Sequence, residues 1–422
     1  MTKFAEFSHR KPLTTALALA LGSAISLGLA RFSYALFLPL MREDLGWSYL
    51  IAGMMNTANA AGYFIGAILA PWCFRRASIG KVFIAGAFLT SLLLGFSGLV
   101  TGTLALFLLR FLAGVGSALV FVGGGALAAQ LGSLHPGRSG FLLGIYYGGT
   151  GFGIILSSIL VPLTASWAIQ QNYLHAWQSA WCVLSVTALT LSFLIIRPSL
   201  SVPVFVSKTA SGSTTQVSRY LYIVVAYCCF GMGYIGYMTF VIALLKQIGL
   251  AGSTLNIFYA VLGLFVMASS RIWAPILDRY KGGQSLAIFN TLLGIASFIP
   301  AIIALTQNQK LITTGILGTA STAPTLGNFS IMAIFVSGMV FGACFVSAVA
   351  ATTSFVKHNL PQAQWVSGIT VFTVIFAMGQ VLGPTIVGWI SDGSGGLARG
   401  LLLSGFLLLT GAVLAWRQKP LK

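Results

Sequence analysis

The sequence predicts an all-α membrane protein with twelve transmembrane helices arranged as two pseudo-symmetric six-helix bundles. Three observations lead to this fold class: the composition, a series of apolar runs, and a weak internal repeat. Of the 422 residues, 57% are hydrophobic and 7% are charged, whereas roughly a quarter of an ordinary soluble domain is charged. This composition excludes the collagen-like, disordered and secreted disulfide-rich classes.

Apolar runs long enough to cross a bilayer, about 20 residues each, occur along the whole chain. They lie at 13–38, 50–73, 82–100, 104–131, 140–165, 177–196, 220–244, 254–277, 285–306, 329–355, 365–391 and 400–416. The first run follows basic residues, as a signal peptide would, but it is too long and eleven similar runs follow it. We therefore expect it to be retained as the first transmembrane helix.

The formal net charge of +18 follows the expected topology. With the N-terminus in the cytoplasm, 16 of the 23 Lys and Arg residues fall at cytoplasmic ends of the spans and four at the other ends. Both termini are therefore expected in the cytoplasm, and the charge is assigned to topology and anionic lipid rather than to a nucleic-acid partner. The remaining three cations, Arg31, Arg110 and Arg271, lie inside predicted helices.

A polar connection at 197–219, rich in Ser, Thr and Pro, divides the chain into 1–196 and 220–422 with six spans each. We predict an N-terminal bundle, a cytoplasmic linker and a C-terminal bundle with these bounds. Two short matches support a duplication. At an offset of 203, Gly28-x-x-Arg31-x-x-Tyr34 with Leu45-Gly46 aligns with Gly231-x-x-Tyr234-x-x-Tyr237 with Ile248-Gly249. At an offset of 208, Gly66-Ala-Ile-Leu-Ala70 aligns with Ala274-Pro-Ile-Leu-Asp278.

This arrangement of spans, termini and central loop resembles the major facilitator superfamily over the whole chain. The superfamily signature between helices 2 and 3 is retained in the second half as Asp278-Arg279-Tyr-Lys281, while the first half keeps its basic residues but has Ala70 where the acid is expected. The resemblance implies alternating access between two bundles, with helices 1, 4, 7 and 10 lining the centre. It also implies that Asp278, Arg279 and Lys281 act in a cytoplasmic gate.

Two further motifs narrow the resemblance. The helix 4 signature, an Arg followed by a glycine-rich face, matches Arg110 with Gly114-Val-Gly116. Arg31-Phe-Ser-Tyr34, together with Thr57-Ala-Asn59-x-x-Gly62-Tyr63, resembles a bacterial branch whose members mostly lack an assigned substrate. This branch implies the bacterial inner membrane as the location.

The three arginines within the spans point to an anionic substrate. An Arg near the middle of a span costs about 2.5 to 3.5 kcal/mol on insertion scales, and none of the five acids falls in the middle third of a span. Guanidinium groups facing a cavity would attract an anion, and their planar fork matches carboxylate, sulfonate or phosphate. The sequence therefore favours an organic-anion transporter.

Each arginine has an alternative role. Arg31 could bond an unwound carbonyl or reach the outer surface, and Arg110 could be structural or coupling, because Arg is widespread at its motif position across the superfamily. Arg271 is similar to the helix 8 Arg of monocarboxylate, oxalate and nitrate transporters, but it stands one residue closer to the signature acid. It could instead pair within the cytoplasmic gate.

Uncharged side chains near these cations are candidates for orienting a ligand by directed hydrogen bonds, with helix packing as the alternative for each. They are Tyr34, Asn59, Tyr63, Tyr146, Tyr147, Tyr234, Tyr237 and Gln380. A glycine-rich stretch, Gly149-Thr-Gly151-Phe-Gly153, lies within a predicted helix and is not preceded by a strand. We interpret it as a site of close helix packing rather than phosphate binding.

The predicted function is a secondary active transporter that moves a small organic anion by alternating access and is coupled to protons. Anion exchange and facilitated diffusion are the other coupling modes, and Asp44 or Asp392 would titrate in a proton-coupled one. The alternative is an exporter of hydrophobic drugs or other amphiphilic compounds, although the Gly-Pro pair common on helix 5 of such exporters is on helix 11, at Gly383-Pro384.

No enzymatic activity, cofactor or metal is expected, since no combination of His, Cys and acid within the spans provides a nucleophile with a base or a metal cluster. The five cysteines lie in or beside apolar runs and show no zinc spacing. A sensor would usually carry a soluble output domain, and the longest polar segment has 23 residues. We expect a monomer whose partners are the bilayer and a small anion.

Overall fold

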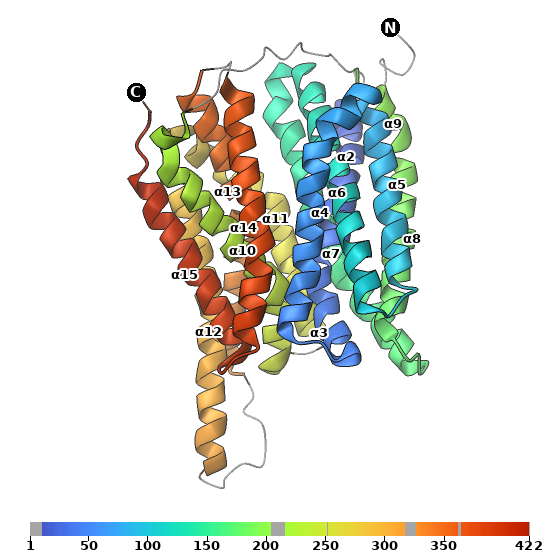
Figure 1. The fold of residues 1–422 in the computed structure, drawn as a ribbon, viewed down its shortest axis with the longest axis vertical. Coiled ribbons are helices and arrows are strands. Elements are labelled where there is room, and N and C mark those ends of the chain that lie inside the picture. Colours follow the sequence, from blue (N-terminus) through green and yellow to red (C-terminus); the bar gives the residue numbers. More distant parts are fainter. Residues whose placement is uncertain (1–10, 204–215, 251, 317–325, 362–363, 422) are drawn as a thin grey trace. The chain divides into compact units, whose positions relative to one another are not determined.

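The computed structural model describes residues 11–203, 216–250, 252–316, 326–361 and 364–421. Within these ranges the chain is helical apart from short connections, and it contains no strand (Figure 1). Helices are the expected solution in a bilayer, because they satisfy every backbone hydrogen bond within one segment. The structure thus confirms the predicted all-α fold class.

Each predicted apolar run coincides with one helix or one continuous helical run. The first run is built from α2 (Pro12–Ser23), η1 (Ala24–Phe32) and α3 (Tyr34–Leu45). The other helices are α4 (Tyr49–Arg76), α5 (Ile79–Ser97), α6 (Thr103–Ser133), α7 (Ser139–Gln170), α8 (Ala176–Leu194), α9 (Ile196–Ser201), α10 (Leu221–Gln247), α11 (Ser253–Arg279), α12 (Gln284–Ile316), α13 (Asn328–Asn359), α14 (Trp365–Ser391) and α15 (Gly396–Arg417). Single 3-10 turns lie at Pro136–Arg138 and Val217–Tyr220.

Eleven helical segments in the described residues are long and apolar enough to cross a membrane. The remaining predicted span, α4, has 28 residues and is long enough, but it is less apolar. The difference lies in its first half, which carries Asn56, Thr57 and Asn59. Polar residues at these depths are tolerated where they face the protein interior, and Asn56 and Asn59 are buried.

Two glycines that the repeat aligns end their helices in the same way. Gly46, directly after α3, has a φ of +65°, and Gly249, just past α10, has a φ of +92°. A left-handed residue after the last helical turn allows a reversal that side chains with a Cβ disfavour. The backbone conformation is therefore repeated at positions 203 residues apart, as the duplication predicts.

The contacts divide the chain into two units. Unit 1 contains the described residues of 1–40, 55–211 and 263–272, and unit 2 those of 41–54, 212–262 and 273–422. In unit 1, α5 packs on α6 and α8, and α2 and η1 pack on α7; in unit 2, α15 packs on α10 and α12, while α14 packs on α10 and α13 on α12. The predicted division of the chain at 197–219 stays a prediction.

Glycines set the closest helix contacts of unit 1. A Cβ at Gly62 of α4 would overlap the Phe111 carbonyl of α6, and one at Gly114 of α6 would overlap the Asn59 carbonyl of α4. Helix α7 approaches the first helical run equally closely, because Cβ atoms at Gly149 and Gly153 would strike the carbonyls of Ala20 and Ala24. The packing interpretation of the glycine-rich stretch in α7 is thus confirmed.

We expect Gly114→Ala to lower the thermal midpoint of the purified protein, since the added Cβ must push α4 and α6 apart, at a cost of about 1 to 3 kcal/mol. Gly140→Ala is the matched control, because nothing lies within 4 Å of a Cβ there. Circular dichroism during heating in detergent measures the thermal midpoints of both variants. An unchanged midpoint for Gly114→Ala would mean that this helix contact is not tight.

Candidate functional site

Arg31 lies in η1, a π-helical segment of nine residues. A π-helix is rare and is frequently found at functional sites. At the end of η1, the Ser33 amide donates to the Gly28 carbonyl at 3.0 Å and the Ser33 hydroxyl donates to the Leu29 carbonyl at 2.5 Å. The next carbonyl, that of Ala30, accepts a hydrogen bond from Arg110 of α6. The wide turn therefore connects the two candidate arginines directly.

The side chain of Arg31 is buried, with 2% of its surface exposed. Its guanidinium carbon lies 5.4 Å from the ring centroid of Tyr63 on α4. Its Nε and Nη2 atoms are buried without a hydrogen-bond partner. Among the described residues Arg31 forms no ion pair. A buried charged donor without a hydrogen-bond partner lowers the stability of the fold unless a ligand or water reaches it.

Arg110 is buried to a similar extent, with 3% of its surface exposed, but it is better held. Its Nη1 donates to the Ala30 carbonyl at 2.6 Å, and its guanidinium carbon lies 4.8 Å from the Tyr34 ring and 5.8 Å from the Trp181 ring. Its Nε and Nη2 atoms, like those of Arg31, have no hydrogen-bond partner. The two arginines are close enough to interact electrostatically.

Asn59 connects α4 to the same place. Its Nδ2 donates to the Arg110 carbonyl at 3.1 Å, and its Oδ1 is buried without a hydrogen-bond partner. The close approach at Gly62 and Gly114 brings the two helices within reach of this bond. Asn59 thus fixes the backbone that carries Arg110 and leaves one acceptor beside it.

Aromatic rings from three helices form a row of contacts that begins with Tyr63 beside Arg31. Beyond Tyr63 lie Phe121 of α6, 6.4 Å away between ring centroids, and Tyr147 of α7, 5.6 Å from Phe121. These three side chains, which we call the aromatic face, are each only half-buried. Tyr146 is fully buried beside them, and its hydroxyl donates to the Phe121 carbonyl at 2.7 Å. Tyr146 therefore supports α6, while the aromatic face remains partly open.

The candidates in unit 2 form an uncharged cluster. Gln380 of α14 donates from Nε2 to the hydroxyl of Tyr234 on α10, and the Gln380 Oε1 is buried without a hydrogen-bond partner. Tyr237 hydrogen-bonds with Ser337 at 3.1 Å. Tyr234 stacks on Phe230, Phe345 and Phe376. In the described chain the buried charged side chains are Arg31 and Arg110, both in unit 1.

The structure does not bury Arg271 with the other two arginines. Its side chain is exposed, and its guanidinium carbon lies 5.5 Å from the ring of Phe141. Of the predicted gate, Asp278 lies in the last turns of α11 with its side chain outside the described part of the structure. Arg279 lies beside the Tyr280 ring, at 5.7 Å, and the Lys281 carbonyl accepts from Asn359 at 2.6 Å. The roles of these four residues stay predictions.

A second set of polar contacts, which the sequence analysis missed, holds residues 41–54 within unit 2. The Asp392 carboxylate at the end of α14 accepts from the amides of Tyr49 and Leu50, at 2.6 and 2.9 Å, and so caps the first turn of α4. Glu43 of α3 pairs with Lys246 of α10 at 2.8 Å. A local sequence pattern does not predict a pair of residues 203 positions apart. The positions of Glu43 and Lys246 are, however, equivalent under the repeat.

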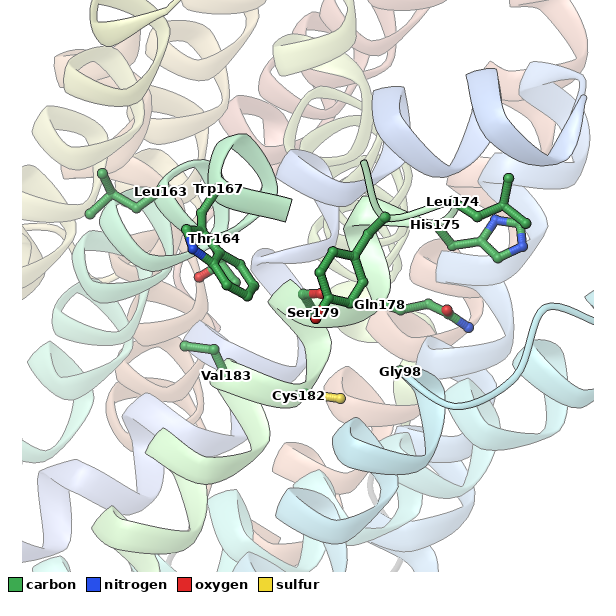
Figure 2. Close-up of a pocket in the computed structure, with 11 residues that line it drawn as sticks. Gly98, Leu163, Thr164, Trp167, Leu174, His175, Gln178, Ser179, Cys182 and Val183 are labelled. Carbon is green, nitrogen blue, oxygen red and sulfur yellow. The ribbon is translucent and has the colours of Figure 1, made fainter. Parts of the chain in front are cut away.

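An open pocket of about 760 Å³ lies where α7 ends and α8 begins (Figure 2). It is lined by Gly98, Leu163, Thr164, Trp167, Tyr173, Leu174, His175, Gln178, Ser179, Cys182 and Val183. None of the predicted site residues is among them. Exposed Trp167 and Tyr173 beside apolar side chains are typical of the membrane–water interface, so this pocket is distinct from the arginine site.

The apolar helices define an integral membrane protein, and the family that its sequence matches makes it a transporter of the major facilitator type for a small molecule. The chain matches the family described as "Uncharacterised MFS-type transporter YbfB" at residues 23–319 and 291–416, and it belongs to that family. It is therefore a transporter rather than an enzyme.

Among similar proteins is a putative tartrate transporter of Agrobacterium vitis, 24% identical over 404 residues, which cover 89% of this chain and 83% of the relative. A bacterial homologue of the human lysosomal transporter Spinster, in an inward-facing conformation, has a TM-score of 0.65 and 13% identity over 99% of this chain and 97% of its own. The nucleoside transporter NupG has a TM-score of 0.67 and 13% identity over 97% and 99%. At these identities the two structures support the fold alone.

The two arginines should differ in what they contribute to stability. Arg110→Met removes the bond to the Ala30 carbonyl, and we expect it to lower the free energy of unfolding by about 1.5 to 3 kcal/mol. Arg31→Met removes a buried charge without a hydrogen-bond partner at two of its nitrogens, so we expect equal or higher stability in ligand-free protein. Urea unfolding in mild detergent distinguishes the two. A loss at Arg31 as large as that at Arg110 would indicate a structural role for both.

The Glu43 and Lys246 pair can be tested by exchanging its charges. Because the two side chains are 59% and 38% exposed, the interaction should be worth only about 0.2 to 1 kcal/mol. We expect Glu43→Lys and Lys246→Glu each to lower the thermal midpoint slightly and the double variant to recover it at low salt. Additive losses in the double variant would contradict the pairing.

Proposed function

We propose that this protein is a secondary transporter that moves a small organic anion across the bilayer, with Arg31 and Arg110 as its anion-binding groups. The observation that carries the proposal is the pair of buried guanidinium groups, each with two nitrogens lacking a hydrogen-bond partner and neither with an ion pair among the described residues. A buried charge of this kind is tolerated where a counter-charge or water can reach it.

The guanidinium nitrogens without a hydrogen-bond partner have the right geometry to bind a carboxylate. On both arginines the nitrogens without a partner are Nε and Nη2, which together form one edge of the guanidinium fork. This edge can donate two parallel hydrogen bonds to a carboxylate. Arg110 can do so without releasing the Ala30 carbonyl, because that bond uses Nη1. Arg110 would therefore combine the structural and the substrate-binding roles that the sequence analysis left open.

Other predicted residues take supporting places in this proposal. Tyr34 and Tyr63 flank the two guanidinium groups, and the free Oδ1 of Asn59 could accept from a hydroxyl or a protonated group of the ligand. The relatives named putative tartrate transporters are consistent with a carboxylate substrate. Tyr146, Tyr237 and Tyr234 already have hydrogen bonds that hold helices together.

We propose alternating access by two six-helix bundles, 1–196 and 220–422, joined by the 197–219 linker. The protein would act as a monomer in a bacterial inner membrane, with both termini in the cytoplasm.

We propose that transport is coupled to protons and that a proton and the anion enter the basic site together, since no described carboxylate contacts Arg31 or Arg110. Uptake into vesicles should then rise with an inwardly directed proton gradient.

The test is thermal unfolding of the purified protein with a panel of carboxylates, sulfonates, phosphates and lipophilic cations. An anion at a hundred times its dissociation constant should stabilise the folded state by about 2.7 kcal/mol, and Arg31→Ala should abolish this effect. Arg399→Ala is the control, because Arg399 is exposed and bonds Ser394. Stabilisation only by lipophilic cations, or an anion response that Arg31→Ala leaves unchanged, would favour the exporter alternative.

A further inference from the structure

We infer that the transported anion carries an aromatic ring, which packs on the aromatic face of Tyr63, Phe121 and Tyr147 while its carboxylate binds Arg31. This inference rests on the proposed function and adds the substrate class. It departs from what the name of the tartrate relatives would suggest, because tartrate has hydroxyl groups in place of a ring.

The first step is the continuity between the charge and the rings. The Arg31 guanidinium carbon lies 5.4 Å from the Tyr63 centroid, the Tyr63 and Phe121 centroids are 6.4 Å apart, and those of Phe121 and Tyr147 are 5.6 Å apart. All three rings belong to unit 1, and they come from α4, α6 and α7. An anionic group on Arg31 therefore has the Tyr63 ring beside it, and Phe121 and Tyr147 continue the row of rings away from Arg31.

The second step is the availability of these rings. Tyr63, Phe121 and Tyr147 are half-buried, whereas Tyr146 behind them is fully buried and bonded through its hydroxyl. The rings around Arg110 are less exposed than these three. Tyr34 and Trp181 are buried, and Trp181 stacks on Phe37 at 3.8 Å with an angle of 5° between the planes. The open aromatic surface is thus on the side of Arg31.

The third step is the orientation of the rings. The planes of Tyr63 and Phe121 meet at 55°, and those of Phe121 and Tyr147 at 52°. A ring placed against this tilted surface meets both faces and edges, the arrangement that aromatic pairs prefer. Hydroxyl groups placed against the faces of these three rings would lose water, and on this surface only the phenol hydroxyls of Tyr63 and Tyr147 could replace it. The surface therefore favours a ring over a polyhydroxylated chain.

The test measures the affinity of the full-length protein in detergent by calorimetry for benzoate, cyclohexanecarboxylate and tartrate. Benzoate and cyclohexanecarboxylate have nearly the same size and charge, and the saturated acid is the more lipophilic. Hydrophobic burial alone would therefore favour the saturated acid. We expect benzoate to bind roughly tenfold more tightly than either of the others.

Two variants then separate the ring from the charge. Phe121→Leu should reduce the preference for benzoate over cyclohexanecarboxylate to about threefold or less while leaving the saturated acid nearly unaffected, and Tyr147→Leu should act in the same direction. Arg31→Met should abolish binding of both acids. Phe96→Leu is the matched control, because Phe96 is an exposed phenylalanine on α5. Comparable thermal midpoints show that the variants are folded.

The outcomes distinguish this inference from the proposed function. If tartrate or cyclohexanecarboxylate binds as tightly as benzoate and binding still requires Arg31, the aromatic inference is overturned and the anion transporter stands. A benzoate preference that survives both aromatic variants also overturns the inference. If none of the three acids binds, the aromatic inference is overturned and the proposed function is decided by the wider panel of anions. If binding of an acid persists in Arg31→Met, the role of Arg31 in the proposed function falls and the inference falls with it.

Discussion

The arrangement of unit 1 depends on the cost of holding two guanidinium groups in a region where water is scarce. Arg31 and Arg110 are nearly fully buried, yet the partners they have are a single backbone carbonyl and several rings. Close helix contacts at glycines bring these partners within reach, and the π-helical turn presents the Ala30 carbonyl to Arg110. The remaining nitrogens have no hydrogen-bond partner, and the proposed binding of an anion rests on this property.

The helices were predictable because a chain in a bilayer must satisfy its backbone hydrogen bonds internally, and apolar runs of about 20 residues do so as helices. The arginines were predictable for a related reason: a charge inside a span has few roles.

Other features of the site could not be predicted from the sequence. Whether an amide bonds the residue four or five positions earlier leaves no mark on apolar periodicity, so the π-helical segment ending at Phe32 was missed. Phe121 and Trp181 were missed because one more aromatic residue in an apolar span carries no signal until the fold sets its neighbours.

The repeat aligns residues of different chemistry at one of its matched positions. Tyr234 aligns with Arg31, and in the structure it forms a neutral hydrogen bond with Gln380 within a stack of aromatic rings. The two clusters therefore offer different surfaces, one cationic with a partly open aromatic face and one uncharged and closely packed. The two halves of a pseudo-symmetric fold can thus carry clusters of different chemistry at equivalent positions.

The pair between Glu43 and Lys246 has a consequence for the repeat. Under the repeat these two side chains occupy the same position, so their contact lies where a two-fold axis would pass. In a symmetric dimer of one six-helix unit, such a position would face its own copy, and either residue would meet a like charge. Opposite charges here require two different sequences, so this is a contact that two identical copies of one unit could not make.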